Sequence, residues 1–314
     1  MAKGIDVRDY KYLIIGGTQR AATTSIFRYL ADHPEVCPSN MKETRFFLDK
    51  DYPLRVKYRF EEGMDKYNEY FCHCPSHRDL RVEATPHYLY SPNTPIRIKN
   101  SLPSVKIVFT LREPISRLIS LYKLAKQLRH IAPTMSFELF VQEQLQAIEE
   151  GSLRPMWMRT LEEGRYSVYL KPYFEIFSRE DVCVVWFEDL CEKPKETVQK
   201  ICNFAGIDPA FFEDYNFRTF NPTYPVRSSI VHYIYWKLRG RFLYYIHNRT
   251  LIWKILRSIN FTIEPLYLKL NRQPFEDVKI MPETRSFLID YYRDEPKELE
   301  SLIGEQPPWQ LEVI

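Results

Sequence analysis

The sequence predicts an α/β protein in which helices cover both faces of a mostly parallel sheet. Four short apolar runs, typical of buried strands, occupy residues 11–15, 80–83, 106–111 and 182–187. Helical patterns separate these runs, and such alternation is typical of βαβ units. The length of 314 residues allows one domain of this kind with insertions.

Five stretches predict helices, at residues 24–31, 114–128, 136–150, 195–205 and 228–258. Pro114 suits the first position of the second helix, where a missing N–H costs nothing. Between the first two strands, residues 32–78 predict loops and short helices over the sheet. We expect a single domain over 1–314, with an α/β core (10–224), a basic aromatic helical insertion or lid (225–270) and a C-terminal helix packing on the core (271–314).

Composition excludes several classes of protein. Hydrophobic residues make up 45% and charged residues 27% of the chain, a globular balance that excludes wholesale disorder. No uncharged apolar run approaches the roughly 20 residues that cross a bilayer, and the first apolar stretch is too short for a signal peptide. We therefore expect a soluble, cytoplasmic protein.

The six cysteines show no paired CxxC spacing. Cys72-His73-Cys74, with His77 nearby, is a metal-site alternative, but a zinc site needs a second ligand pair at regular spacing. We expect ordinary thiols in a reducing compartment.

Charge is unevenly distributed although the net charge is only +3. Residues 215–263 contain eight lysines and arginines and no acidic residue, which indicates an anionic ligand, substrate or surface. One interpretation of this basic aromatic stretch is a helical pair that packs on the core. The other is an acceptor lid, or a peripheral surface for acidic lipid or glycan. No nucleic-acid-binding module is recognisable.

The first predicted strand ends in an anion-binding pattern, Gly16-Gly17-Thr18-Gln19-Arg20-Ala21-Ala22-Thr23-Thr24-Ser25. Unpaired N–H groups at the start of the following helix favour a phosphate. Ala21 and Ala22 admit close backbone approach, and the hydroxyls of Thr23, Thr24 and Ser25 add donors. The lysine of a Walker A motif is missing, which argues against a nucleotide kinase. A capped helix without a ligand is the simpler alternative.

Two further segments suggest site residues. Arg112 stands at the carboxyl end of a strand, where open α/β sheets bind ligands, and with Ser120 it suits a second phosphate; a surface ion pair is the alternative. Glu43, between Lys42 and Arg45 and before two phenylalanines, suits a general base; again a surface ion pair is the alternative.

In this order the three segments resemble the sulfotransferases that use 3′-phosphoadenosine 5′-phosphosulfate (PAPS), nearest their heparan-sulfate-type and bacterial branch. The loop matches the family's 5′-phosphosulfate loop, 112–120 its 3′-phosphate signature, and 42–47 its K-E-x-x-F-F segment. Further similar segments are Glu83-Ala84-Thr85-Pro86, Gly164-Arg165-Tyr166-Ser167, Glu188-Asp189-Leu190 and Tyr291-Tyr292…Gly304…Trp309. The family usually has lysine at position 20 and glycine at position 22, and often lysine at position 84.

The resemblance implies a P-loop-like fold and transfer of a sulfuryl group from PAPS to a hydroxyl or amine, with release of adenosine 3′,5′-bisphosphate and no metal. Glu43 would be the base, with His87 as the alternative, and Arg20 with the loop would stabilise the leaving phosphate. Arg112 and Ser120 would hold the 3′-phosphate, and Arg227 is a further donor contact. The acceptor would be a small metabolite, sugar or lipid that the sequence does not identify. A non-catalytic nucleotide- or anion-binding protein and a kinase-like phosphotransferase remain alternatives, and the oligomeric state is unknown.

Overall fold

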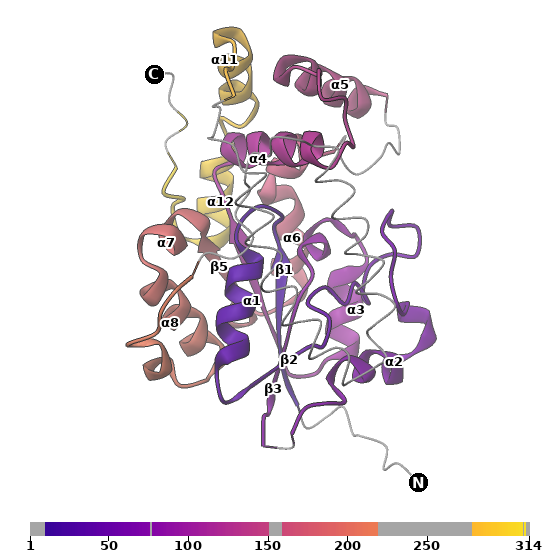
Figure 1. Ribbon diagram of the computed structural model, residues 1–314, viewed down its shortest axis with the longest axis vertical. Helices are drawn as coiled ribbons and strands as arrows, with labels where there is room; N and C mark the ends of the chain where they lie inside the picture. Colours follow the sequence, from indigo (N-terminus) through magenta and orange to yellow (C-terminus); the bar gives the residue numbers. More distant parts are fainter. Residues whose placement is uncertain (1–9, 76, 151–158, 219–277, 310, 312–314) are drawn as a thin grey trace, which may run out of the picture. The chain divides into compact units, whose positions relative to one another are not determined.

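The computed structural model describes residues 10–75, 77–150, 159–218, 278–309 and 311 (Figure 1). These residues form a five-stranded, entirely parallel sheet with the strand order β2-β3-β1-β4-β5. The strands are β1 (Lys11–Gly17), β2 (Val36–Pro38), β3 (Leu80–Ala84), β4 (Val105–Leu111) and β5 (Val182–Trp186). The predicted α/β class is confirmed, and β1 lies where the strand order reverses.

The described residues also form helices. They are α1 (Thr23–Asp32), α2 (Met64–Asn68), α3 (Thr94–Ser101), α4 (Pro114–Gln127), α5 (Phe137–Glu149), α6 (Tyr166–Ile176), α7 (Phe187–Glu192), α8 (Pro194–Ala205), α11 (Pro282–Tyr291) and α12 (Glu295–Ile303). The predicted helices at 24–31, 114–128, 136–150 and 195–205 are present within a residue or two at each end, whereas 228–258 lies outside the described residues. The prediction of loops and short helices over 32–78 missed the edge strand β2, which is too short to show periodicity.

The chain divides into two compact units, and the sheet belongs to the first. That unit contains Met1–Arg117, Leu161–Asn221 and Ser286–Ile314; the second contains Leu118–Thr160 and Pro222–Arg285. Within the second unit, Ser136 caps α5 by accepting a hydrogen bond from the N–H of Leu139 at 3.1 Å. No helix in the described part of the chain is long and apolar enough to cross a bilayer. The predicted domain boundaries stay predictions.

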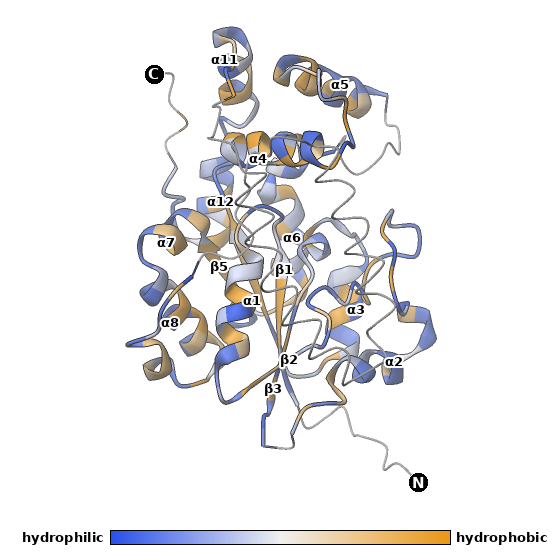
Figure 2. Ribbon diagram, viewed as in Figure 1, coloured by the Kyte–Doolittle hydropathy of each residue, from blue (hydrophilic) through white to orange (hydrophobic). Residues whose placement is uncertain are grey.

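Two apolar clusters cover the two faces of the sheet. Alternate residues of β1 contribute to the two clusters: Tyr12 and Ile14 belong to one, and Leu13 and Ile15 belong to the other. The first cluster includes residues of α6 and α12, and the second includes residues of α1 and α8. Figure 2 shows hydrophobic colour over part of β1, and every residue of the strand after Lys11 is buried, as expected for a strand covered on both faces.

Cys37 on β2 and Cys74 form a disulfide, with Cα atoms 5.7 Å apart. The expectation that all six cysteines are ordinary thiols is therefore wrong for this pair. The sequence separation of 37 residues hid the pairing, because cysteine spacing alone does not determine connectivity. Cys72, Cys183, Cys191 and Cys202 are free thiols.

A buried carboxylate attaches α12 to the start of α6. Glu295 accepts hydrogen bonds from the backbone N–H and the hydroxyl of Ser167, at 2.7 and 2.8 Å. Burial raises the pKa of the Glu295 carboxyl to about 7, against the opposing effect of the Ser167 hydrogen bonds. The folded state therefore holds a proton on Glu295 at pH values where the unfolded chain, with a glutamate pKa of about 4.3, has lost it.

This difference predicts a pH-dependent stability. The contribution of the bound proton is complete below pH ~4, and it is lost as the pH rises through about 7. Urea unfolding should therefore show the wild-type free energy of unfolding falling over this window relative to Glu295→Gln, whose amide does not titrate. Equal pH dependence of the two proteins would contradict a raised pKa at Glu295.

Candidate active site

The predicted anion loop joins β1 to α1 and is tightly packed where it begins. A Cβ atom at Gly16 would lie 2.7 Å from the ring of Phe109, and one at Gly17 would lie 2.9 Å from Leu89 Cβ. Later in the loop, Arg20 and Ala22 have left-handed backbones, with φ of 66° and 60°. Such conformations cost a residue with a Cβ about 1–2 kcal/mol, so the surrounding structure holds this shape of the loop.

Helix α1 begins at Thr23, immediately after Ala22. The N–H groups of a first helical turn have no carbonyl within the helix to bond, and they carry the positive end of its dipole. Thr23 and Ser25 are buried and Thr24 is half-buried. The structure thus places the loop residues predicted from the sequence around a helix N-terminus that suits a phosphate.

Arg117, a residue without a predicted role, supports the loop. Its side chain is completely buried, Nε donates to the carbonyl oxygen of Gln19 at 3.2 Å, and Nη2 pairs with Glu163 at 3.1 Å. A buried guanidinium needs such partners because its desolvation is otherwise costly. In the sequence, only its position five residues after Arg112 could have suggested a role for Arg117. A helical arginine is ordinarily expected at the surface.

Arg112 lies against the same loop. Its Nη1 donates to the carbonyl oxygen of Arg20 at 3.2 Å, and its guanidinium carbon lies 4.4 Å from the ring centre of Phe187. Burial together with Arg112 lowers the pKa of Arg20 to about 10. The Nε of Arg112 is buried without a hydrogen-bond partner among the described residues. The guanidinium groups of Arg20 and Arg112, together with that Nε–H of Arg112, suit the binding of an anion.

The alternative of an ion pair between Arg112 and Glu113 is not what the structure shows. Both carboxylate oxygens of Glu113 accept backbone N–H groups at the start of α4, from Ile115 at 2.8 Å and Ser116 at 2.6 Å. Ser120 is buried on α4, in the part that belongs to the second unit. Its predicted pairing with Arg112 stays a prediction, and Arg227 lies outside the described residues.

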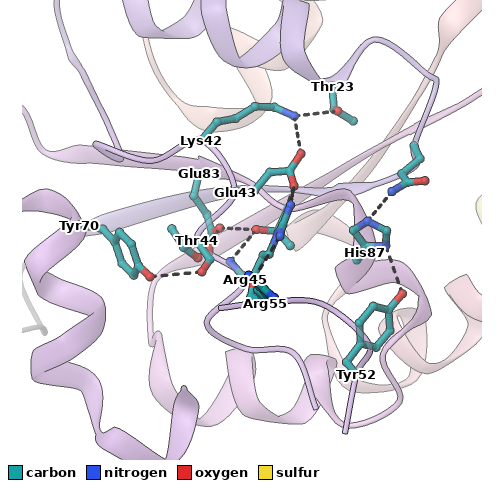
Figure 3. A network of polar contacts seen from close by, with 12 residues as sticks. Thr23, Lys42, Glu43, Thr44, Arg45, Tyr52, Arg55, Tyr70, Glu83 and His87 are labelled. Atoms are coloured by element: carbon teal, nitrogen blue, oxygen red, sulfur yellow. Dashed lines mark hydrogen bonds and ion pairs between the residues drawn. The ribbon is translucent and has the colours of Figure 1, made fainter. Parts of the chain in front are cut away.

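Lys42 connects the loop with the predicted base (Figure 3). Its Nζ donates to Thr23 Oγ1 at 3.3 Å and pairs with Glu43 Oε1 at 3.4 Å. The other oxygen of Glu43 accepts from Arg45, from Nη2 at 2.7 Å and Nε at 3.2 Å. The structure therefore brings the carboxylate of Glu43 close to the N-terminus of α1, and the ion pairs predicted as the alternative role are also present.

Burial and the opposite charge of neighbouring side chains act in opposite directions on the pKa of Lys42 and on that of Glu43. Burial raises the pKa of Glu43, but Lys42 and Arg45 lower it more, so the net pKa is below the ordinary range. Burial lowers the pKa of Lys42, and Glu43 opposes that shift only in part. Glu43 is thus an ionised carboxylate at neutral pH, able to accept a proton, beside an ammonium that loses its proton more readily than an ordinary lysine.

His87, the alternative base, lies nearby with both ring nitrogens occupied. The side-chain amide of Gln19 donates to Nε2, and Nδ1 hydrogen-bonds the Tyr52 hydroxyl at 3.2 Å. Burial, above all, lowers the pKa of His87 to about 3. The imidazole is therefore neutral at neutral pH and links the loop to the segment that carries Tyr52.

A buried carboxylate fixes the chain on either side of this cluster. Glu83 on β3 accepts hydroxyl hydrogen bonds from Thr44 at 2.7 Å, Thr85 at 2.9 Å, Tyr88 at 3.0 Å and Tyr67 at 3.1 Å. Next to Glu83, the N–H of Ala84 donates to the Lys42 carbonyl at 2.9 Å. These bonds tie the segment carrying Lys42 and Glu43 to the end of β3.

A pocket of about 360 Å³ opens beside Glu43. It is lined by Met41, Lys42, Glu43, Thr44, Arg45, Arg55, Val56 and Lys57. Four cations and one carboxylate give this lining a net charge of +3. Arg55 and Lys57 were not singled out from the sequence, since they lie in a segment with alternating exposure that carries no motif.

Comparisons with known proteins identify relatives of this chain. Residues 13–219 match the family model described as "Sulfotransferase domain". "Bifunctional heparan sulfate N-deacetylase/N-sulfotransferase 4" of Mus musculus is 25% identical over 214 residues, which cover 64% of this chain and 23% of that protein. The human "Bifunctional heparan sulfate N-deacetylase/N-sulfotransferase 2" is 29% identical over 211 residues, covering 63% and 22%. The chain thus matches about a quarter of the length of these relatives.

Among solved structures, the "Crystal Structure of Sulfotransferase from Alicyclobacillus acidocaldarius" is similar, with a TM-score of 0.63 and 23% identity. The similarity covers 95% of this chain and 97% of that one. At this identity the comparison establishes a shared fold.

Proposed function

This chain belongs to the sulfotransferase domain family, and on that premise we propose that it transfers a sulfuryl group from PAPS to a hydroxyl or amine. The observation that carries the proposal is the position of Lys42, whose ammonium contacts both Thr23 of the loop and the carboxylate of Glu43. This contact supports a reaction centre at which Glu43 would act as base beside the N-terminus of α1.

The residues suit the two ends of the donor. The N-terminus of α1, with Thr23, Thr24 and Ser25, would hold the 5′-phosphosulfate, and the unsatisfied Nε of Arg112 fits an anionic oxygen. The hydroxyl or amine of the acceptor is the nucleophile that attacks the sulfur atom of PAPS. Glu43 takes the proton from the acceptor as its oxygen or nitrogen bonds to sulfur, and the bond from sulfur to the 5′-phosphate oxygen breaks with its electron pair leaving on that oxygen.

Lys42 and Arg20 stabilise the charge that grows on the leaving phosphate. Donors that are already positioned where charge develops need little reorganisation during the reaction. The family's usual loop lysine is replaced by Arg20, and Lys42 brings an ammonium to the same helix N-terminus from a different segment. We therefore propose that Lys42 is the cation of this site that can lose its proton, in contrast to Arg20.

Calorimetry with adenosine 3′,5′-bisphosphate, ADP and ATP tests the donor class. We expect the bisphosphate to bind most tightly, and Arg112→Gln to weaken its binding on the order of 10- to 100-fold, since a hydrogen bond to a charged group is lost. Preference for ATP would favour the kinase-like alternative. Equal binding of all three nucleotides would favour a non-catalytic anion-binding protein.

The charge of the pocket indicates an acidic acceptor. Lys42 and Arg45 pair with Glu43, whereas the structure shows no carboxylate partner for Arg55 among the described residues, and Lys57 lies over the rings of Tyr58 and Tyr70. We propose that Arg55 and Lys57 bind a carboxylate, sulfate or phosphate group of the acceptor, which orients its hydroxyl or amine toward Glu43.

An acceptor screen with labelled PAPS tests this specificity, using pairs of sugars or metabolites that differ by one anionic group. We expect the anionic member to be preferred, and Arg55→Gln to raise KM for it while leaving the neutral member unchanged. Arg59→Gln, on the same segment but outside the pocket lining, is the matched control. Preference for neutral acceptors would contradict the assignment of Arg55 and Lys57.

A further inference from the structure

Three potential metal ligands that are not part of the pocket lining converge at the edge of the sheet. Cys37 Sγ, Cys74 Sγ and a ring nitrogen of His73 all lie within 4.8 Å of one another. Cys37 comes from β2, whereas His73 and Cys74 follow the short 3-10 helix Glu69–Phe71. The tertiary structure thus adds a distant cysteine to a Cys-His-Cys segment that lacked a further ligand in the sequence, and it leaves Cys72 and His77 out of the cluster.

Backbone contacts fix the positions of these ligands. Cys37 pairs with Arg81 in the register of β2 and β3, and the N–H of Cys74 donates to the carbonyl of Phe71 at 3.0 Å. The guanidinium of Arg78 bonds the carbonyl of Val36 at 3.0 Å, beside Cys37. These contacts position Cys37 and Cys74 in addition to the bond between their sulfur atoms.

The geometry suits a zinc-type ion once the disulfide is reduced. Cys37 Sγ lies 3.9 Å from His73 Nε2. A tetrahedral ion with metal–sulfur bonds of about 2.3 Å and metal–nitrogen bonds of about 2.0 Å separates sulfur from nitrogen by roughly 3.6 Å. After reduction, two thiolates and one imidazole would form a donor set typical of zinc, and a water would complete the four positions.

From these observations we propose that Cys37, Cys74 and His73 form a thiol-based zinc site that alternates with the disulfide. Reduction by an external dithiol transfers two electrons and two protons, which gives two thiols and a disulfide on the reductant. Zn²⁺ then displaces both thiol protons and binds the two sulfur atoms and the His73 ring. This site lies outside the proposed sulfuryl transfer and does not depend on it.

Cobalt substitution tests the proposal on the full chain. After reduction under nitrogen, Co²⁺ should produce a thiolate-to-cobalt charge-transfer band with one ion per chain, and Zn²⁺ should remove it. The oxidised protein, Cys37→Ser and Cys74→Ser should lack the band, and His73→Ala should weaken binding. Cys72→Ser, which changes the neighbouring exposed thiol, should bind Co²⁺ as the wild type does.

Circular dichroism keeps the result interpretable if reduction affects folding. A reduced protein that unfolds and regains its structure with Co²⁺ or Zn²⁺ would support the site, because binding energy then contributes to folding. A reduced, folded protein without the band would overturn it. So would an unfolded protein that no metal restores, or a band that persists in the Cys37→Ser and Cys74→Ser variants.

Discussion

Glutamine in place of Glu43 should lower turnover by a factor on the order of 10²–10⁴, the usual contribution of a general base. The amide keeps the size of the side chain and can still accept a hydrogen bond from Arg45 or Lys42, but it cannot take a proton from the acceptor. Binding of adenosine 3′,5′-bisphosphate should therefore be unchanged, since the loss falls on the chemical step. Single-turnover rates with labelled PAPS, combined with calorimetry, separate the two effects.

Replacing His87, the alternative base, provides the comparison for Glu43→Gln. If Glu43→Gln keeps full turnover while His87→Gln abolishes it, the proton acceptor is His87. Glu180→Gln, a change at an exposed carboxylate, is the control for loss of one negative charge. With Glu43 as base, turnover should persist as the pH falls to the ordinary glutamate pKa of about 4.3, because Lys42 and Arg45 hold the pKa of Glu43 below that range.

Replacing Lys42 by methionine should reduce turnover by about 10²–10³-fold, as removal of one positioned oxyanion donor does. Lys42→Arg keeps the charge and should recover part of the rate. Burial lowers the pKa of Lys42, so wild-type turnover should fall as the pH rises through that lowered value. An arginine stays protonated, and the alkaline fall should therefore disappear in Lys42→Arg.

The pH profile distinguishes this role from a structural one. An alkaline limb that remains unchanged in Lys42→Arg would show that another group titrates. Equal turnover in Lys42→Met and in Lys50→Met, a change at an exposed lysine, would remove Lys42 from the site. Calorimetry with the bisphosphate shows whether a lost rate reflects weaker donor binding.

Local sequence patterns were sufficient for much of this framework. Short apolar runs predicted four of the five strands, because strands buried on both faces are rich in apolar residues, although β3 also buries Arg81 and Glu83. The segment Gly16–Ser25 and Arg112 could be assigned to the carboxyl ends of strands, where parallel sheets bind ligands. The order and spacing of these segments also indicated the family that the comparisons then established.

Tertiary structure decided what depends on contacts between distant residues. Arg117 reaches the carbonyl of Gln19, and Cys37 reaches Cys74, across sequence separations that no local periodicity encodes. Lys42 looked like one member of a surface ion pair until folding placed its ammonium against Thr23. Amino-acid sequence determines the elements through short-range packing and hydrogen bonding, whereas the identity of the charges that meet at a site follows from the way those elements pack.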